Sequence, residues 1–310
     1  MGYTSNNFGI LIAEGTSTDS IYFTSAAPAG SKTAGDWEYL GFYSGAGSNS
    51  IMKYCAVDYG GGYSDNGSIY IDGSSVKIDN SRISNSLTSD IYCHNSGRFG
   101  SFTNNNVVIS QTYPVIIDAN EAHTLGTGNT YSDPGIFVNA ATISANVTWL
   151  AQSAPYIING DVYVESASGN TLTISAGTVV KFDQGSDIYV GYSSNTSGKL
   201  IALGTSTNGI TFTTAASPGS ESAGGWNGIF FEAGTASGSI LDYCTISYGG
   251  GYGAPTSGNV TCDGVGAGRL TISNSTITNS AGFGIYIPSG STPTLTTNIF
   301  TGNVGTDTGS

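Results

Sequence analysis

The sequence predicts an all-β solenoid in which short strands wind into stacked coils. Three observations lead to this prediction: a long segment of the chain recurs, short β-prone runs alternate with Gly, Asn and Ser, and helical periodicity is weak everywhere. The composition agrees, because only 9% of the 310 residues are charged, against about 25% in an average soluble domain. Heptads of Leu, Glu, Lys and Arg are missing, which excludes a coiled coil or a helical bundle.

The long repeat sets the organisation of the chain. Residues 2–63 align without a gap with residues 191–252, an offset of 189 residues, and more than half of the aligned positions are identical. YCAVDYGGGY in the first segment, for example, matches YCTISYGGGY in the second. We therefore predict one continuous solenoid in two repeat units, residues 1–147 and residues 148–310, each of them an incomplete copy of a unit of about 189 residues.

A shorter period inside the repeat predicts the individual coils. Two tracks of apolar residues advance by nearly the same steps, which indicates coils of about 25 residues with several strands each. These tracks are Ile229–Val260–Ile285 and Ile240–Leu270–Leu295. Within a run the residues alternate, as in TLTI at residues 171–174, so that one set faces inward and the other outward.

Asparagines at equivalent places in the two units predict the corners between strands. Asn80 and Asn85 in the first unit match Asn274 and Asn279 in the second. Asn tolerates the left-handed backbone conformation and can bond its own turn. We expect these side chains to stack into hydrogen-bonded ladders from coil to coil.

With these residues in view, the chain resembles a known family. The segment TWLAQSAPYIINGDVYVESASGNTLTISAGTVVKF (residues 148–182) resembles a pattern of right-handed parallel β-helix repeat proteins of the prokaryotic secreted or cell-surface type. LIALGTSTNGITFTT, GGWNGIFF and LDYCTISYGGG resemble it too. The resemblance implies a right-handed parallel β-helix of about a dozen coils and an extracellular or cell-surface location. It leaves the activity open, because the family includes polysaccharide lyases, epimerases and adhesins.

Charge and hydropathy exclude two classes of partner. The net charge is −13, and eight scattered bases cannot form the basic patch that nucleic acid requires. No apolar run approaches the roughly 18 residues that span a membrane.

The ends of the chain predict its partners. The chain starts and stops within a repeat unit and shows no signal peptide, so we expect it to be a piece of a longer repeat protein. We find no amphipathic helix to cover the open sheet edges at either end. The expected partners are therefore neighbouring repeat units or other copies of the chain, which could stack head to tail into filaments.

A lyase is the main catalytic alternative, and the resemblance implies an Arg or Lys base for it. Lys77, Arg82 and Arg98 are the one local concentration of bases. Their counterparts in the second unit are uncharged, so surface charge is the simpler interpretation. The acidic chain would also repel an acidic polymer at long range.

Metal sites have little support in the sequence. Neither histidine has a second His or a Cys at ligand spacing, so a zinc site is not expected. Calcium needs only oxygen ligands, and Asp183 with Asp187 is the candidate pair. Otherwise we predict no cofactor.

The tryptophans and cysteines each allow two interpretations. Trp37 and Trp226 occupy equivalent places and could stack on sugar rings, although a scaffold role at a coil corner is the simpler interpretation. Two of the four cysteines match Ile in the other unit, and spacing favours no pair. We predict four unpaired thiols in the core.

The leading interpretation is a non-enzymatic structural or adhesive module of a secreted or cell-surface repeat protein. The alternative is a carbohydrate-active β-helix, either a polysaccharide lyase or a glycan-binding protein, with polysaccharide as the partner. Ice binding is a minor alternative because Thr alternates along several strands, but Val260 and Cys262 flank a single Thr261 and interrupt the row.

Overall fold

The computed structural model describes residues 1–2, 8–46, 49–64, 66–108, 111–193, 195–254 and 256–309. The chain folds into two compact units. Unit 1 comprises residues 1–138 and 152–155, and unit 2 comprises residues 139–151 and 156–310. Strand β14 (Ile136–Ile143) contains the boundary between them.

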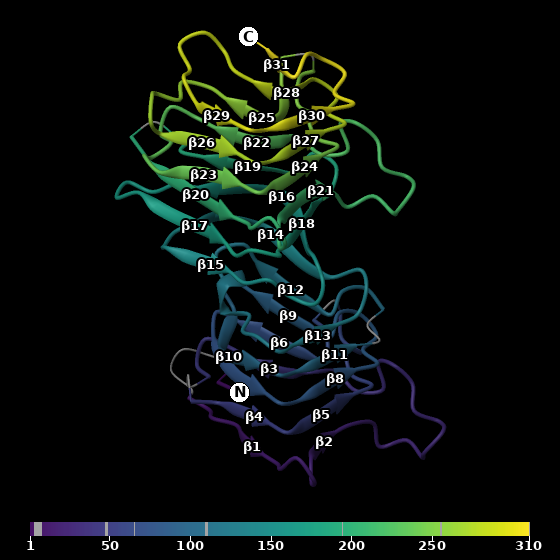
Figure 1. Cartoon of the computed structure of the whole chain (residues 1–310). Helices are drawn as coiled ribbons and strands as arrows, with labels where there is room; N and C mark the ends of the chain where they lie inside the picture. Colours follow the sequence, from purple (N-terminus) through teal and green to yellow (C-terminus); the bar gives the residue numbers. More distant parts are fainter. Residues whose placement is uncertain are drawn as a thin grey trace. The chain divides into compact units, whose positions relative to one another are not determined.

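Unit 1 is built from three parallel sheets, and its first four coils each contribute one strand to every sheet (Figure 1). The first sheet contains β1 (Ile12–Glu14), β4 (Ile51–Lys53), β7 (Ser75–Asp79) and β10 (Arg98–Thr103). The second contains β2 (Ile21–Phe23), β5 (Cys55–Asp58), β8 (Arg82–Ser84), β11 (Asn106–Val108) and β13 (Thr130–Tyr131). The third contains β3 (Leu40–Phe42), β6 (Ile69–Asp72), β9 (Ile91–His94) and β12 (Val115–Asp118).

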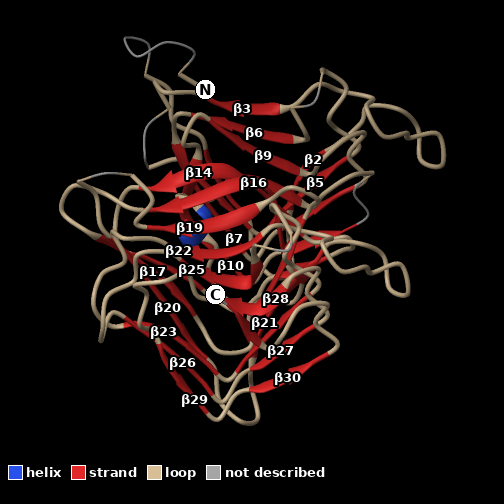
Figure 2. Cartoon of the chain, turned by 90° about the horizontal axis from the view of Figure 1, so that it is seen from above, coloured by secondary structure: helices blue, strands red, loops and turns tan. Residues whose placement is uncertain are grey.

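Unit 2 repeats this plan, and its strands lie in three directions around a common interior (Figure 2). The first sheet contains β15 (Val147–Trp149), β17 (Asn170–Ile174), β20 (Gly198–Leu203), β23 (Ser239–Asp242), β26 (Leu270–Ser273) and β29 (Thr294–Thr296). The second contains β18 (Val179–Phe182), β21 (Ile210–Thr214), β24 (Cys244–Ser247), β27 (Thr276–Thr278) and β30 (Ile299–Thr301). The third contains β19 (Asp187–Val190), β22 (Gly228–Phe231), β25 (Gly258–Cys262), β28 (Phe283–Tyr286) and β31 (Thr308–Gly309).

The long strand β16 (Tyr156–Val164) serves two sheets of unit 2, because its first half pairs with β18 and its second half with β19. The helical content is a single described 3₁₀ turn, η1 (Ala122–Thr124). Among the described residues there is no helix with the length and hydropathy of a membrane span.

The predicted all-β parallel solenoid is therefore confirmed. One predicted track is also correct to the residue, because Ile229 pairs with Val260 and Val260 with Ile285. The other track is wrong by a slip in register. Ile240 pairs with Thr271, so the row that faces the core is Leu241–Ile272–Leu295. Successive strand residues face opposite sides, and Ile240 is therefore partly exposed whereas Leu241 is buried.

Alternating strands bury one row of side chains per sheet. Along β17 the buried residues Leu172 and Ile174 alternate with the partly exposed Thr171 and Thr173, as predicted. All four cysteines are buried and unpaired, as predicted. Burial also raises the pKa of the Cys244 and Cys262 thiols to about 12, which keeps them protonated.

The corners that precede and follow the second sheet use left-handed residues in register. Asn80 and Asn274, together with Asn85 and Asn279, all have φ between 48° and 58° as the sequence predicts. The preceding coil places a tyrosine in the same conformation at each of these corners: Tyr54, Tyr59, Tyr243 and Tyr248. The corner conformation therefore persists from coil to coil, although the residue type changes.

A hydrogen-bonded ladder does run along the corner before the second sheet, but it uses the residue that follows the left-handed one. In unit 1, the Ser81 amide donates to Asn105 Oδ1 at 2.9 Å and the Asn105 amide donates to Asn129 Oδ1 at 2.9 Å. The Asn105 Nδ2 group donates to the Ile78 carbonyl at 2.8 Å. At the equivalent corner of unit 2, Ser275 donates to Asn298 Oδ1 at 3.1 Å. The ladder thus satisfies buried backbone groups where the strands end.

Replacing Asn105 by Ala should destabilise unit 1 strongly. The substitution leaves the buried Ser81 amide and the Ile78 carbonyl without their partners. We expect a loss of about 2–4 kcal/mol in the free energy of unfolding, because each unsatisfied buried group costs about 1–3 kcal/mol. Urea denaturation measures it. The control is Asn106→Ala, at the exposed neighbouring position, which should change stability by less than about 0.5 kcal/mol. Equal effects of the two substitutions would refute a stabilising ladder.

Candidate functional site

A row of aromatic side chains runs across the outer surface of the third sheet of unit 2. Strand register places one residue from each of five successive coils in line. The members are Tyr163, Tyr189, Phe230, Thr261 and Tyr286. We call this set the aromatic row. Its last three members each follow a residue of the predicted inward track by one position, so alternation turns them outward.

The first three rings of the aromatic row are stacked. The Tyr163 and Tyr189 ring centroids lie 5.3 Å apart with planes 10° apart, and Tyr189 and Phe230 lie 4.9 Å apart at 26°. Tyr192, from the loop after β19, lies 4.8 Å from Tyr189. Tyr252 meets Phe230 edge-on at 5.7 Å. Both loop tyrosines are more than half exposed, so their rings extend the aromatic surface towards solvent.

The row is interrupted at Thr261, and the gap forms a hollow of about 300 Å³. We call it the row hollow. Phe230 and Tyr286 flank the small Thr261 side chain on the neighbouring coils. The described lining residues are Tyr189, Tyr192, Phe230, Glu232, Tyr252, Thr256, Thr261, Asp263, Tyr286 and Pro288, and none of them is basic.

Two carboxylates lie side by side at the row hollow. Glu232 and Asp263 directly follow Phe231 and Cys262, which pair in register on β22 and β25, so the two acids occupy the same position on adjacent coils. Coils are about 4.8 Å apart along a stack. Burial, and secondarily the Asp263 charge, raise the pKa of Glu232 to about 7. A carboxyl group with this pKa exchanges a proton near neutrality.

A second acid pair lies at the other edge of the aromatic row. Asp161 pairs with Asp187 in register. Asp187 is 1% exposed, and its Oδ2 accepts a hydrogen bond from Asn227 at 3.0 Å. Asp161 accepts one from the Tyr163 hydroxyl at 3.0 Å. Burial, with a contribution from Asp161, raises the pKa of Asp187 to about 7. The aromatic row thus has carboxylates on both sides.

The equivalent surface of unit 1 is closed by its own rings. There the row passes from Gly41 to Tyr70 and Tyr92. Tyr39 and Tyr43 fill the space over Gly41, where an added Cβ would lie 2.7–2.9 Å from their rings. Their hydroxyls bond each other at 2.7 Å, and both rings lie within 6 Å of the Tyr70 ring. Tyr43 stands where unit 2 has Glu232, so the acid replaces a ring that closes the surface in unit 1.

Of the two predicted sugar-stacking tryptophans, Trp226 cannot serve. Its indole is completely buried, stacks on Phe182 at 4.1 Å and donates Nε1–H to the Ser247 carbonyl at 2.8 Å. No face remains open for a sugar ring, which corrects that prediction and favours the scaffold interpretation. Trp37 makes the same bond to the Asp58 carbonyl at 2.8 Å but is only half-buried. It lines a hollow of about 400 Å³ with Tyr22 and Tyr39.

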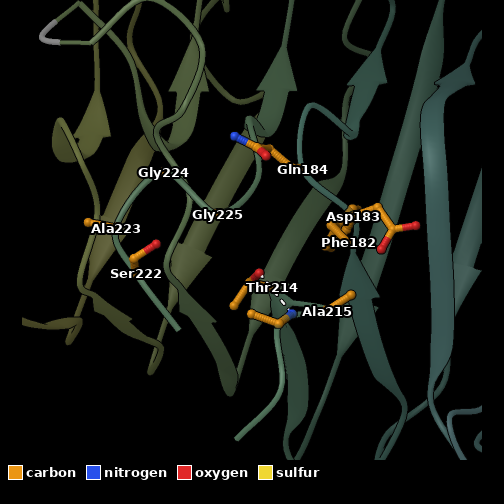
Figure 3. Close-up of a pocket in the computed structure, with 10 residues that line it drawn as sticks. Phe182, Asp183, Gln184, Thr214, Ala215, Ser222, Ala223, Gly224 and Gly225 are labelled. Atoms are coloured by element: carbon orange, nitrogen blue, oxygen red, sulfur yellow. Dashed lines mark hydrogen bonds between the residues drawn. The ribbon is translucent and has the colours of Figure 1, made fainter. Parts of the chain in front are cut away.

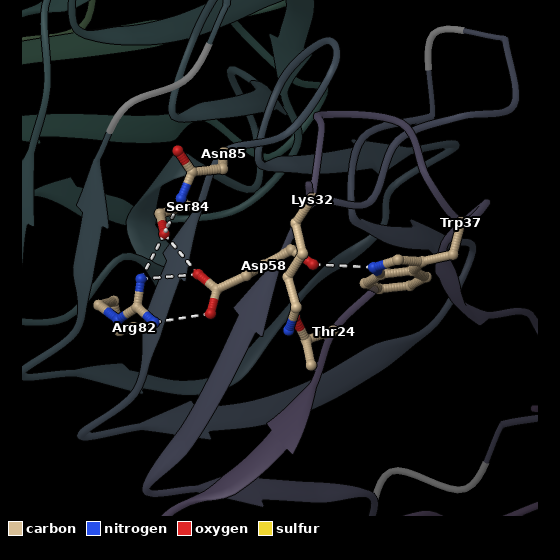
Figure 4. Close-up of polar contacts among 7 residues, drawn as sticks. All are labelled: Thr24, Lys32, Trp37, Asp58, Arg82, Ser84 and Asn85. Carbon is tan, nitrogen blue, oxygen red and sulfur yellow. Dashed lines mark hydrogen bonds and ion pairs between the residues drawn. The ribbon is translucent and has the colours of Figure 1, made fainter. Parts of the chain in front are cut away.

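The three predicted lyase bases do not share one sheet. Lys77 lies on β7 and Arg98 begins β10, both in the first sheet of unit 1. Arg82 lies on β8 in the second sheet, where both of its terminal nitrogens bond the Asp58 carboxylate at 2.6 Å and one also bonds Ser84 (Figure 4). The Arg82 guanidinium is therefore already paired with the Asp58 carboxylate. This arrangement does not bring Lys77, Arg82 and Arg98 together in one groove, as the lyase alternative would require.

The predicted calcium pair, Asp183 and Asp187, has separate sets of partners. The Asp183 carboxylate accepts a hydrogen bond from Asn159 at 3.0 Å. Asp183 also lines a hollow of about 440 Å³, in which its carboxylate points away from Ser222 (Figure 3). Asp187 is buried against Asn227 and Asp161 as described above. Among the described residues no three His, Cys, Asp or Glu side chains are grouped to hold a metal ion.

Thr side chains do align, but on the second sheet of unit 2 rather than around Thr261. Thr211, Thr245 and Thr276 pair in register on three successive coils. In the adjacent row Ser247 is 6% exposed and donates to Thr213 Oγ1 at 2.9 Å. The aligned Thr and Ser hydroxyls of this sheet therefore span only a few coils, and some of them bond each other.

Comparison with known families decides the classification. Residues 146–309, more than half of the chain, match a family model described as "Right handed beta helix region". The chain belongs to this family. The match confirms the resemblance read from the sequence and gives the coils of the β-helix a right-handed winding. No curated protein and no solved structure matches the chain.

Sequence reasoning missed the aromatic row of this β-helix, although a signal was present. The last three members of the row each directly follow a member of the correctly predicted track. Advancing that track by one residue gives Phe230, Thr261 and Tyr286. The place of Tyr189 in the row was harder to predict, because the step from Tyr189 to Phe230 is much longer than the other steps of the row.

The carboxyl of Glu232 should make stability depend on pH. Its pKa is about 7 when folded and 4.5 ordinarily, so its contribution to stability is fully present below about pH 4.5 and is lost as the pH rises through 7. Solvent screening reduces this loss to about 1–2 kcal/mol. Glu232→Gln should remove that part of the decline in the free energy of unfolding between acidic and mildly alkaline pH, as measured by urea denaturation. Glu221→Gln is the control, and an unchanged profile for Glu232→Gln would contradict the raised pKa.

Proposed function

We propose that this β-helix is a non-enzymatic adhesive module of a secreted or cell-surface repeat protein, and that it holds extracellular glycan on the aromatic row of unit 2. The observation that carries the proposal is the alignment of aromatic side chains on successive coils. A surface of stacked rings with carboxylates on both sides suits a sugar polymer. Sugar rings present C–H faces that pack on aromatic rings, and hydroxyl groups that donate to carboxylates.

The open and closed forms of this surface support unit 2 as the binding unit. In unit 1 Tyr39 and Tyr43 contact Tyr70 and cover Gly41, whereas in unit 2 the smaller Thr261 and Glu232 side chains line the row hollow. Ligand sites are concave surfaces with a few convergent polar groups, and the row hollow is a concave surface in which aromatic rings lie beside Glu232 and Asp263. The low proportion of charged residues and the acidic balance support an extracellular setting for the proposed module.

Tyr252→Ala should weaken glycan binding by about 3- to 10-fold, because the substitution removes one exposed ring whose packing is worth about 0.5–1.5 kcal/mol. Affinity electrophoresis against a panel of neutral and charged polysaccharides would identify the ligand and compare the variants. Tyr63→Ala is the matched control, because Tyr63 is the repeat counterpart of Tyr252 in unit 1 and is similarly exposed. Failure of the wild-type protein to bind any member of the panel would overturn the proposal.

A second observation favours association through the outermost coils. In unit 1, Ile12 on β1 and Tyr22 on β2 are about two-thirds exposed, and Phe8 is 83% exposed. In unit 2, Ile299 on β30 is 63% exposed. These strands are the last members of their sheets, and unpaired strand edges with apolar side chains favour pairing with another chain. We propose that a neighbouring repeat unit or a second copy of the chain covers them.

Self-association should be visible as a molar mass that rises with protein concentration in light scattering. Ile12→Lys combined with Ile299→Lys should abolish the rise, because a charge at each edge opposes the contact. Leu203→Lys is the control, since Leu203 is a similarly exposed residue of the inner strand β20. A monomer mass for the wild-type protein at every concentration would rule out stacking between separate molecules.

A further inference from the structure

The row hollow has an unusual combination of linings. Five aromatic residues line it, and the flanking polar groups include the carboxylates of Glu232 and Asp263. The aromatic residues are Tyr189, Tyr192, Phe230, Tyr252 and Tyr286. Aromatic faces carry negative charge density, and carboxylates carry full negative charge. A neutral sugar would exploit the rings but would leave the acid pair without an opposite charge.

We infer that the row hollow binds an organic ammonium group, and that the glycan held by unit 2 is therefore one that carries free amino sugars. This inference rests on the proposed glycan-binding function and names its ligand class. Cations bind over aromatic faces within about 6 Å of the ring centroid, and the attraction is strongest in sites shielded from water.

In this inference the cation lies between the coil of Phe230 and the coil of Tyr286, which are separated by the coil of Thr261. Phe230 and Tyr286 lie on either side of the Thr261 coil, so their backbones are about 9–10 Å apart at the usual spacing of coils. The short Thr261 side chain, which is 6% exposed, lies in that interval and lines the row hollow. Tyr252 reaches Phe230 edge-on and narrows the opening from the loop side. A single ammonium group with the carbon frame of one sugar fits such a gap.

Charge complementarity selects the ammonium over other groups. Glu232 and Asp263 occupy equal positions on adjacent coils, and no described residue that lines the row hollow is basic to neutralise them. Burial, and secondarily the charge of Asp263, raise the pKa of Glu232 to about 7, so the site disfavours two negative charges. An ammonium group relieves that repulsion, whereas a uronic acid would add to it.

Unit 1 provides the contrast expected for a closed surface. Its counterpart of Asp263 is Asp72, which already accepts a hydrogen bond from Asn95 at 2.8 Å and lies 3.4 Å from His94 Nδ1. Tyr43 replaces Glu232, so only one of the two acids is present there. Unit 2 therefore differs from unit 1 in having both acids, Glu232 and Asp263, at this surface.

Isothermal titration calorimetry at low ionic strength tests the inference with three probes: a glucosamine oligomer, the same oligomer fully N-acetylated, and tetramethylammonium. We expect the free-amine oligomer to bind about 10-fold more tightly than the acetylated one, as a cation held by aromatic faces and acids implies. Glu232→Gln and Asp263→Asn should each reduce that ratio towards one. Asp72→Asn is the matched control and should leave it unchanged.

The outcomes separate this inference from the proposed function. Equal affinity for the amine and acetylated oligomers would overturn the ammonium inference and leave glycan binding standing. Binding of tetramethylammonium with no binding of any oligomer would overturn the inference that the ligand is an amino-sugar glycan, and the row hollow would then be a pocket for small organic cations. Absence of binding by all three probes would overturn the ammonium inference, and the polysaccharide panel would then decide the glycan proposal alone.

Discussion

Everything in this structure depends on the in-register hydrogen bonding of each coil to the next. Parallel pairing aligns the residue at one position of a coil with the residue at the same position of its neighbours. Side chains at the same position of successive coils are therefore aligned in rows. The core rows, the left-handed corners, the ladder through Asn105 and the aromatic row are all consequences of this one constraint. Where a row keeps the same kind of side chain, each member packs on or bonds the next. Where the residue type changes, the surface changes at that coil.

The features of interest lie where a row changes. At the corner before the second sheet, Cys55 and Ser81 precede Asn105 and Asn129 in the same row. The side chains of Ser81, Asn105 and Asn129 each accept from an amide of the preceding coil and donate to a backbone carbonyl, so the bonding persists where the row changes from Ser to Asn. On the third sheet the replacement of an aromatic ring by Thr261 opens the row hollow. The scarcity of charge has the same origin. Inward rows exclude charge, so the acids lie on outward rows and in loops. There Glu232 lies beside Asp263 of the next coil, and its pKa is raised by burial and secondarily by the Asp263 charge.

Most of the fold could be predicted, whereas most of the candidate site could not. The parallel coils, the left-handed asparagines and the buried free cysteines follow from alternation and turn chemistry, which are local. The slip that misplaced Ile240 shows the limit: spacing alone cannot separate neighbouring residues that face opposite sides, and only pairing with Thr271 resolves them. Trp226 was ambiguous for a related reason, since its burial against Phe182 depends on a ring from another coil.

The sequence by itself determined that this chain is a stack of parallel coils, because repeat spacing, alternation and corner residues can be recognised within short segments of the chain. Only the tertiary structure decided which outward side chains meet. The members of the aromatic row are separated by steps of 25 to 41 residues, since the loops between coils differ in length. Loop length does not affect the register of the strands, which the hydrogen bonds between coils set. Tyr189, Phe230 and the acid pair of Glu232 and Asp263 therefore come together through pairing that no local pattern of the sequence displays.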